Sequence, residues 1–294
     1  MKHAILGAGA IGGLVGTALA SLGESVTVVV RPGTLPSYPP KLLLERPSGS
    51  GSITAPANAV AALTEPVDVV WIATKTYQLQ TALDAVRVVP GCVVPLLNGV
   101  DHIAVLRARF GQGCVVPATI AVEAERIAPG RFTQRSPFAR LNVAGRGEPP
   151  LGAIVAALGD LGFTCQFIPN EQTLLWSKLC FLGPFALVTS ASGMNVGEIF
   201  ADARWKQRLS SAIAEACAVA NASGAEVDAL QLQAVFDGVP PGMRSSMQKD
   251  VAAGRRLELD AIGGPIVRGG ERHGIDVSTT VELMAAIRSK TGAQ

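Results

Sequence analysis

The residues with the clearest chemical potential form one short run close to the N-terminus, Gly7, Ala8, Gly9, Ala10, Ile11 and Gly12. The run directly follows a short apolar segment at residues 3–6 and precedes a stretch rich in alanine, leucine and valine. In this spacing, the first glycine allows a tight turn, the second lets the backbone approach a pyrophosphate, and the third lets a helix pack closely on the strand. The first N–H groups of that helix then bind the phosphate. The run therefore predicts a dinucleotide site.

The residue that follows the second apolar segment bears on which dinucleotide is bound. Sites for NAD usually carry an Asp or Glu here, which accepts a hydrogen bond from the ribose 2′-OH. This chain has valines at residues 28–30 and then Arg31. A guanidinium carries a permanent charge and donates in a fork that fits a 2′-phosphate, so Arg31 favours NADP. The competing interpretation is an ordinary solvated surface arginine.

Two further polar residues follow apolar segments. Lys75 comes shortly after residues 67–73, and Asn98 comes directly after residues 92–97. Ligands of an open parallel sheet bind just past the carboxyl ends of its strands. Lys75 is therefore a candidate for a phosphate or the substrate, and Asn98 for the nicotinamide ribose or the substrate. Each residue is also of a type common in turns and on surfaces.

The elements that must position these residues follow from the hydrophobic pattern. Strands at residues 3–6, 25–30, 67–73 and 92–97 alternate with helical segments, which predicts an α/β domain with a Rossmann-type, doubly wound parallel sheet. The further elements expected in this domain are strands at 115–122, 131–133, 141–144 and 165–168 and helices at 81–88 and 151–161. Beyond residue 168, helical periodicity dominates at 173–182, 205–222 and 257–272. We therefore expect an NADP-binding domain at residues 1–168 and an all-helical substrate domain at 169–294.

Composition excludes several classes of protein. Of the 294 residues, 48% are hydrophobic and 16% charged, a balance that argues against disorder. The net charge of +2, without a long basic run, gives no footprint for nucleic acid. The five cysteines form no CxxC pair, so we expect neither structural disulfides nor a metal site. With no signal peptide and no apolar stretch of about 20 residues, the chain is expected to be cytoplasmic, without a membrane partner.

Taken together, the motifs of this chain resemble those of the ketopantoate reductase (2-dehydropantoate 2-reductase) family over essentially its whole length. The resemblance rests on the glycine run, on Arg31, and on the segments at residues 74–76, 97–100, 176–179, 245–250, 258–262 and 272–277. It implies an NADP-dependent oxidoreductase that reduces a small 2-keto acid to the 2-hydroxy acid, as in the step from ketopantoate to pantoate in pantothenate biosynthesis. The order and spacing of the segments are more specific than any one of them.

The resemblance also implies roles for residues of the helical domain. Lys178 would be the catalytic acid, Glu258 a second catalytic group near it, and Ser246 a donor to the substrate, with Asn98 also contacting the substrate. Each has a plainer interpretation. Lys178 could extend from an apolar helix to solvent, and Glu258 could be a solvated helix residue. Ser245 with Gln248 predicts a capping box, so Ser245 would be structural while Ser246 faces the ligand.

The chain departs from the family where the substrate is held. The resemblance places asparagines at three positions that are occupied here by Leu182, Ala186 and Met243. Pro184 should kink or break the helix early, and Asn195 is the nearby amide that would compensate. Loss of hydrogen-bonding groups changes substrate preference, so we expect a less polar keto acid. A related NADP-dependent hydroxyacid dehydrogenase and a non-catalytic NADP-binding sensor remain open, as does a homodimer.

Overall fold

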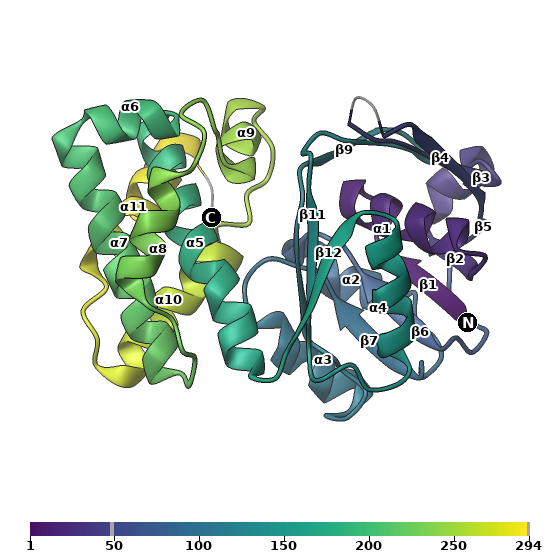
Figure 1. The fold of residues 1–294 in the computed structure, drawn as a ribbon. Helices are drawn as coiled ribbons and strands as arrows, with labels where there is room; N and C mark the ends of the chain where they lie inside the picture. Colours follow the sequence, from purple (N-terminus) through teal and green to yellow (C-terminus); the bar gives the residue numbers. More distant parts are fainter. Residues whose placement is uncertain (48–49, 293–294) are drawn as a thin grey trace. The chain divides into compact units, whose positions relative to one another are not determined.

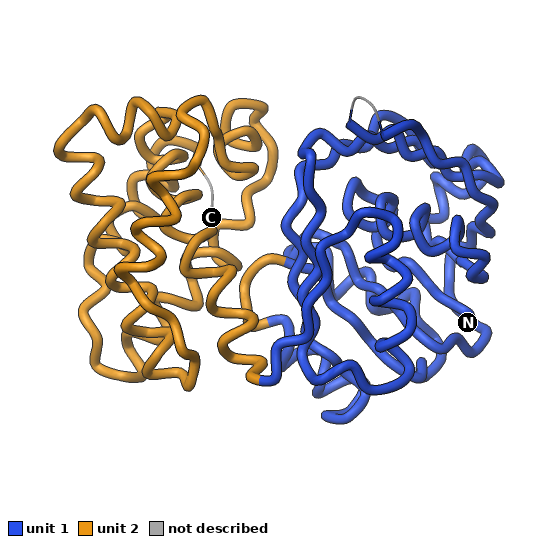
Figure 2. Tube along the Cα trace, viewed as in Figure 1, with its two compact units in different colours: residues 1–97, 102–169 blue, residues 98–101, 170–294 orange. Residues whose placement is uncertain are grey.

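The structure is a computed structural model that describes residues 1–47 and 50–292. The chain divides into two compact units, which are coloured separately in Figure 2. The first unit comprises Met1–Leu97 and His102–Pro169, and the second comprises Asn98–Asp101 and Asn170–Gln294. The short segment Asn98–Asp101 therefore belongs with the C-terminal part of the chain, although it follows a strand of the N-terminal part. We call the two units the sheet unit and the helical unit.

A parallel five-stranded sheet forms the centre of the sheet unit. Its strand order is β5-β2-β1-β6-β7, and every pairing between neighbours is parallel (Figure 1). The strands are β1 (Lys2–Leu6), β2 (Ser25–Val29), β5 (Asn58–Val60), β6 (Val69–Ile72) and β7 (Cys92–Pro95). Strands β6 and β7 are buried along their whole length, as expected for a parallel sheet covered on both faces. This confirms the predicted Rossmann-type architecture.

Helix α1 (Ala10–Ser21) packs against this sheet and also against a second one. The second sheet is mixed, with the order β4-β3-β10-β9. Its strands are β3 (Lys41–Glu45), β4 (Ser52–Pro56), β9 (Ala124–Ala128) and β10 (Arg131–Gln134). Nearly all of α1 is buried, and Gly13 lies so close to Phe132 of β10 that an added Cβ would be 2.1 Å from its ring. Gly23, with φ +84°, follows the helix in the left-handed conformation that glycine commonly adopts after a helix.

The remaining elements of the sheet unit are a three-stranded sheet and several short helices. The sheet has the order β12-β11-β8, from β8 (Ala118–Ala121), β11 (Ala139–Ala144) and β12 (Phe163–Ile168). The helices are η1 (Pro32–Ser37), η2 (Thr76–Gln78), α2 (Leu79–Leu83), α3 (His102–Phe110) and α4 (Leu151–Asp160). The helix predicted at residues 81–88 is wrong at its end. Val86 instead forms a bridge with Leu63 beside the sheet, because its side chain is needed in that core.

All elements assigned to the helical unit are helices, as predicted (Figure 1). They are α5 (Glu171–Ser192), α6 (Val196–Ala201), α7 (Ala203–Ala222), α8 (Ala229–Asp237), α9 (Ser246–Ala252), α10 (Leu259–His273) and α11 (Ser278–Thr291). Helix α5 contacts α7, α9, α10 and α11, so it is the central helix of this unit. The predicted break at Pro184 is wrong. The helix continues to Ser192, because residues 183–190 are all buried in the core of the unit and packing outweighs one lost hydrogen bond.

Helix α5 is also the one described helix that is long and apolar enough to meet a membrane-span test. Most of its most apolar window is buried inside the unit, as in the core helix of a packed bundle. It begins at Asn170, whose side-chain oxygen accepts hydrogen bonds from the backbone N–H groups of Gln172 and Thr173. It ends at Gly193, which has φ +80°. Both helix ends are therefore set by local sequence.

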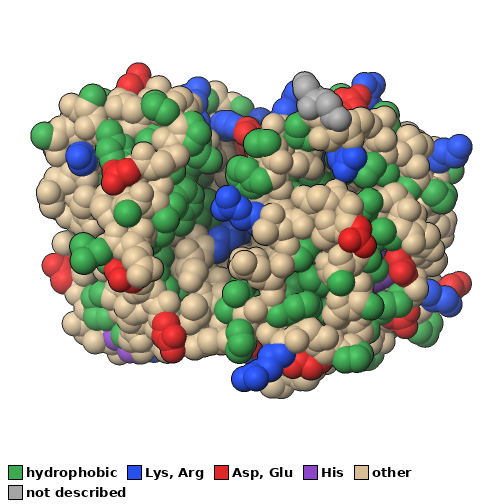
Figure 3. Space-filling model, viewed as in Figure 1, with side chains coloured by type: hydrophobic (Ala, Val, Ile, Leu, Met, Phe, Trp, Pro, Cys, Tyr) green, Lys and Arg blue, Asp and Glu red, His purple; other side chains and the backbone are tan. Residues whose placement is uncertain are grey.

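The cysteines and the charged side chains of the surface were both considered in the composition above. The five cysteines are free thiols. On the face drawn in Figure 3, lysine and arginine side chains lie in small groups with acidic side chains between them.

Candidate active site

The glycine run forms the turn between β1 and α1. Gly7 has φ +106°, and a Cβ there would lie 2.8 Å from the backbone of Ala73, so only glycine fits. A Cβ on Gly12 would lie 2.1 Å from the carbonyl oxygen of Gly7. Gly9 differs from both, because an added Cβ would meet nothing within 4 Å. The space in front of Gly9 is therefore open to a ligand.

The start of α1 has the features of an anion site. Gly9 is the N-cap residue, no side chain caps the helix, and its first turn carries no acidic residue. The initial N–H groups of a helix lack partners within it, and the helix dipole adds a partial positive charge there. These observations fit the pyrophosphate of a dinucleotide. They are also compatible with Ala10 and Ile11 contributing backbone N–H groups rather than side chains.

Strand register places the other candidates of the sheet unit at the same edge. Leu6 of β1 pairs with Val29 of β2 on one side and with Ile72 of β6 on the other. The chain therefore leaves all three strands at one level, so Arg31 follows β2 and Lys75 follows β6 on the edge that carries the glycine turn. Arg31 is exposed at the start of η1, and Lys75 is half-buried at the start of η2.

Thr74 is a candidate that the sequence analysis did not single out, beyond its place in the segment at residues 74–76. Its backbone nitrogen is one of the atoms that a Cβ on Gly7 would meet, at 2.8 Å. Its side-chain oxygen is buried and has no hydrogen-bond partner among the described residues. A buried hydroxyl without a partner is costly, so Thr74 fits a role in binding the same ligand. Its position directly after an apolar segment is the sequence feature that could have identified it.

The helical unit brings three of the predicted residues together. The ammonium of Lys178 donates a hydrogen bond to Oδ1 of Asn98 at 3.1 Å. Nδ2 of Asn98 donates to Oε2 of Glu258 at 3.3 Å. The amide of Asn98 therefore links a cation to an anion in one chain of hydrogen bonds, which we call the Lys178 chain. Glu258 is buried and does not cap α10, although it lies immediately before that helix.

Burial changes the acidity of the lysine. Lys178 is half-buried on α5, between the buried residues Trp176 and Leu179. Desolvation lowers the pKa of Lys178 from 10.5 to about 8, and the negative charge of Glu258 opposes part of this shift. An ammonium with a pKa near 8 can both donate a proton and carry positive charge near neutral pH. The arrangement is therefore suited to protonating an oxygen that gains negative charge.

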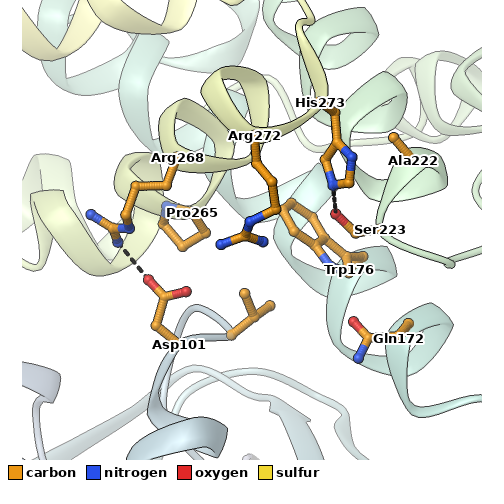
Figure 4. A pocket seen from close by; sticks show the side chains of 10 residues that line it. Asp101, Gln172, Trp176, Ala222, Ser223, Pro265, Arg268, Arg272 and His273 are labelled. Carbon is orange, nitrogen blue, oxygen red and sulfur yellow. Dashed lines mark hydrogen bonds and ion pairs between the residues drawn. The ribbon is translucent and has the colours of Figure 1, made fainter.

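Direct backbone packing holds Asn98 against α10. Gly99 has φ +81°, and a Cβ there would lie 2.2 Å from the carbonyl oxygen of Ala261 in the first turn of α10. Arg268 of α10 then pairs with Asp101 at 2.5 Å (Figure 4). It also pairs with Asp260 at 2.9 Å. These pairs are exposed, so each stabilises only modestly. Together with the close approach at Gly99, they fix the segment Asn98–Asp101 relative to the helix.

Ser246 does not join this group through any hydrogen bond in the described part of the chain. It is exposed in the first turn of α9. Its neighbour Ser245 is the N-cap, as predicted, and accepts a hydrogen bond from the N–H of Gln248 at 3.0 Å. The capping box itself is incomplete, because the side chain of Gln248 donates to the carbonyl of Met194 instead.

The three positions at which the family resemblance led us to expect asparagines differ in exposure. Ala186 is fully buried in the hydrophobic core, Leu182 is half-buried, and Met243 is 37% exposed. Asn195, expected as a compensating amide, caps α6 and forms a full capping box with Glu198. Its side-chain oxygen is therefore engaged in structure.

Two models of one protein family match most of the chain. Residues 3–145 match the family model described as ketopantoate reductase PanE/ApbA, and residues 170–291 match the model for its C-terminal domain. The 2-dehydropantoate 2-reductase of Caulobacter vibrioides is 33% identical, over 97% of this chain and 98% of that protein. The chain belongs to the ketopantoate reductase family. It is therefore an oxidoreductase.

Other relatives and solved structures extend the comparison. The 2-dehydropantoate 2-reductase of Mycobacterium tuberculosis is 28% identical over 98% of both chains. The crystal structure of a PanE/ApbA family ketopantoate reductase from Ralstonia eutropha is similar with a TM-score of 0.86, at 26% identity and 99% coverage of both chains. A D-mandelate dehydrogenase shares the fold, with a TM-score of 0.84 at 20% identity and 99% coverage of both chains.

Proposed function

We propose that this member of the family reduces a small 2-keto acid to the 2-hydroxy acid with NADPH. The observation that carries the proposal is the Lys178 chain, in which a lysine of lowered pKa is hydrogen-bonded to Asn98 and through it to Glu258. The open glycine turn at the start of α1 supports a dinucleotide cofactor. An ammonium poised near neutral pH is what protonation of a carbonyl oxygen requires.

Each residue of the Lys178 chain has its own role in the proposed reaction. The glycine turn at the start of α1 would hold the dinucleotide, whose nicotinamide would supply a hydride for the carbonyl carbon. Lys178 donates its proton to the carbonyl oxygen as negative charge develops there, and regains one from water after product leaves. Asn98 accepts from the ammonium and fixes its position. Glu258 holds the Asn98 amide, which determines that the amide oxygen faces the lysine.

The choice of NADP rests on the end of β2. Residues 25–30 include no Asp or Glu that could accept a hydrogen bond from a ribose 2′-OH. Arg31 follows them, and its guanidinium suits a 2′-phosphate. The D-mandelate dehydrogenase structure is a complex with NADH, but that protein shares only the fold with this chain. The cofactor preference of this chain therefore depends on its own residues.

The substrate is proposed to be less polar than ketopantoate. Leu182 and Ala186 are buried or half-buried apolar residues, and the amide of Asn195 is engaged in a cap. A site that lacks amides for a substrate hydroxyl gains little from that hydroxyl. A 2-keto acid with an apolar side chain suits these positions better.

The test is turnover of a panel of 2-keto acids with NADPH, from ketopantoate to acids with branched or aromatic side chains. We expect kcat/KM to be highest for the apolar members and to fall at least a hundredfold in Lys178→Ala, with Lys206→Ala as the matched control on the same unit. Efficient turnover of ketopantoate above the apolar acids would overturn the substrate assignment. Equal activity in Lys178→Ala would overturn the mechanism, and cofactor binding without any turnover would favour an NADP-binding sensor.

The other expected partners remain predictions. A homodimer would be recognised by light scattering of the purified chain. The cytoplasmic location and the absence of nucleic acid rest on the sequence features described above.

A further inference from the structure

A cavity of about 380 Å³ that is open to solvent on one side is lined by residues of the helical unit, among them the exposed side chain of Arg272 (Figure 4). Its volume is in the range of cavities that bind small molecules. Three lining side chains come from the second half of α10, namely Arg268, Arg272 and His273. Gln172 and Trp176 of α5 and Ser223 after α7 line the opposite wall.

The charges of the cavity leave one cation available. Arg268 is shared between Asp101 and Asp260. Arg272, four residues later on the same helix, has no hydrogen-bond or ion-pair partner among the described residues, and Figure 4 shows its side chain directed across the cavity. A guanidinium offers a planar fork of donors that matches a carboxylate or a phosphate.

Neutral hydrogen-bonding groups accompany the free guanidinium. The amide of Gln172 and the hydroxyl of Ser223 line the cavity, and Nε2 of His273 lies 3.4 Å from the hydroxyl of Ser223. Beside them, the indole of Trp176 and the ring of Pro265 provide apolar surface. A small molecule with one anionic group and a short apolar body would satisfy both kinds of surface.

The cavity shares its walls with the Lys178 chain. Asp101 lies three residues after Asn98, Trp176 lies two residues before Lys178 on α5, and α10 begins directly after Glu258. Three of the four segments that line the cavity therefore also carry one member of the Lys178 chain each, and the end of α7 is the fourth. A ligand that joins α10 to α5 would restrain the segments whose spacing determines the 3.1 Å and 3.3 Å hydrogen bonds.

We propose that this cavity binds a small oxyanion, with a carboxylate or phosphate group on Arg272, and that its occupancy raises turnover by restraining the Lys178 chain. The effect on turnover rests on the proposed function, whereas binding does not. A change in one site's occupancy can alter another site by several-fold without direct contact between the ligands.

Calorimetric titration of the full chain, saturated with NADPH so that the glycine turn is filled, tests the binding. Inorganic phosphate and succinate are the two probes, since they separate a phosphate ligand from a carboxylate ligand. We expect saturable binding of one of them with a Kd of about 1 mM or tighter. Arg272→Ala should weaken it about tenfold or more, and Arg288→Ala, an exposed arginine of α11, should leave it unchanged. No saturable binding of either probe, or equal binding by Arg272→Ala, would overturn the site.

Turnover tests the coupling separately. With a 2-keto acid that the enzyme reduces, the bound probe should raise kcat by about twofold or more in the unaltered chain and not in Arg272→Ala. Binding without any change in kcat would remove the coupling and keep the site. Binding by a chain that reduces no keto acid would instead show that the proposed function fails while the site stands.

Discussion

The ammonium of Lys178 donates a hydrogen bond to the side-chain oxygen of Asn98, which lies 80 residues earlier in the chain. The same amide donates to Glu258, 160 residues after it. The amide is therefore oriented by a donor on one side and an acceptor on the other. Asn98 therefore lies between Lys178 and Glu258 and contacts both through its side chain.

Replacing Asn98 should change both rate and pH dependence. In Asn98→Ala the ammonium loses its acceptor, and kcat should fall about tenfold or more. In Asn98→Asp a carboxylate takes the place of the amide oxygen, so the pKa of Lys178 should rise and activity should persist to higher pH. The measurement is kcat against pH for both variants, with Asn142→Ala in β11 as the control. An unchanged alkaline limb in Asn98→Asp would show that residue 98 does not act on the lysine.

The lowered pKa of Lys178 predicts a pH-dependent cost to stability. The folded-state pKa of about 8 is below the ordinary value of 10.5, so between these values the unfolded chain binds more protons. Stability should therefore rise as the pH increases from about 8 to 10.5, and the cost is fully present below pH 8. Lys178→Met abolishes this dependence. The difference in unfolding free energy between Lys178→Met and the unaltered chain should shrink by on the order of 1 to 3 kcal/mol between pH 7 and pH 10.5. Denaturant unfolding at both pH values measures it, and a constant difference would exclude a lowered pKa.

Two glycines of the same turn should respond oppositely to one methyl group. Gly9→Ala places its Cβ in open space, so the protein should fold with nearly normal stability and bind NADPH about tenfold more weakly. Gly12→Ala places its Cβ against the Gly7 carbonyl, which should destabilise the sheet unit by about 2 kcal/mol. Thermal unfolding and NADPH titration of the two variants separate these effects. Normal NADPH affinity in Gly9→Ala would contradict a pyrophosphate at this turn.

Arg31 should discriminate between the two nicotinamide cofactors. Arg31→Ala removes the charge that we propose binds the 2′-phosphate, so KM for NADPH should rise about tenfold or more while KM for NADH changes little. Steady-state kinetics with both cofactors makes the comparison, and Arg46→Ala in the same unit serves as the control. An equal effect on both cofactors would refute the assignment.

The sequence predicted the parallel sheet and the glycine turn because both depend on local patterns of apolar residues and glycines. It did not predict β3, β4 or β9. β3 and β4 pack on α1, which is a contact distant in sequence, and β9 is largely exposed, so no run of buried apolar residues marks it. The helix break expected at Pro184 does not occur for a similar reason, because the neighbours of Pro184 on α5 are buried in the core of the helical unit.

The candidate site was only partly accessible from sequence. Lys178, Asn98 and Glu258 were each identified, but for separate reasons, and nothing local indicated that Asn98 lies between the other two. That contact depends on the close approach of Gly99 to Ala261, which only the tertiary structure provides. Asn195 was expected to supply an amide to the substrate, but its side chain caps α6 in a capping box with Glu198. The spacing of Asn and Glu three residues apart is the sequence signature of that box.

The most direct test of the account is the pH dependence of kcat for keto-acid reduction at saturating NADPH, measured for the unaltered chain and for Lys178→Ala. If the protonated form of Lys178 donates the proton, as proposed, kcat of the unaltered chain should be high below pH 8 and fall as the pH rises through about 8. In Lys178→Ala, kcat should be at least a hundredfold lower at pH 7 and should not show this fall. A variant that keeps the same rate and the same limb would show that another group supplies the proton.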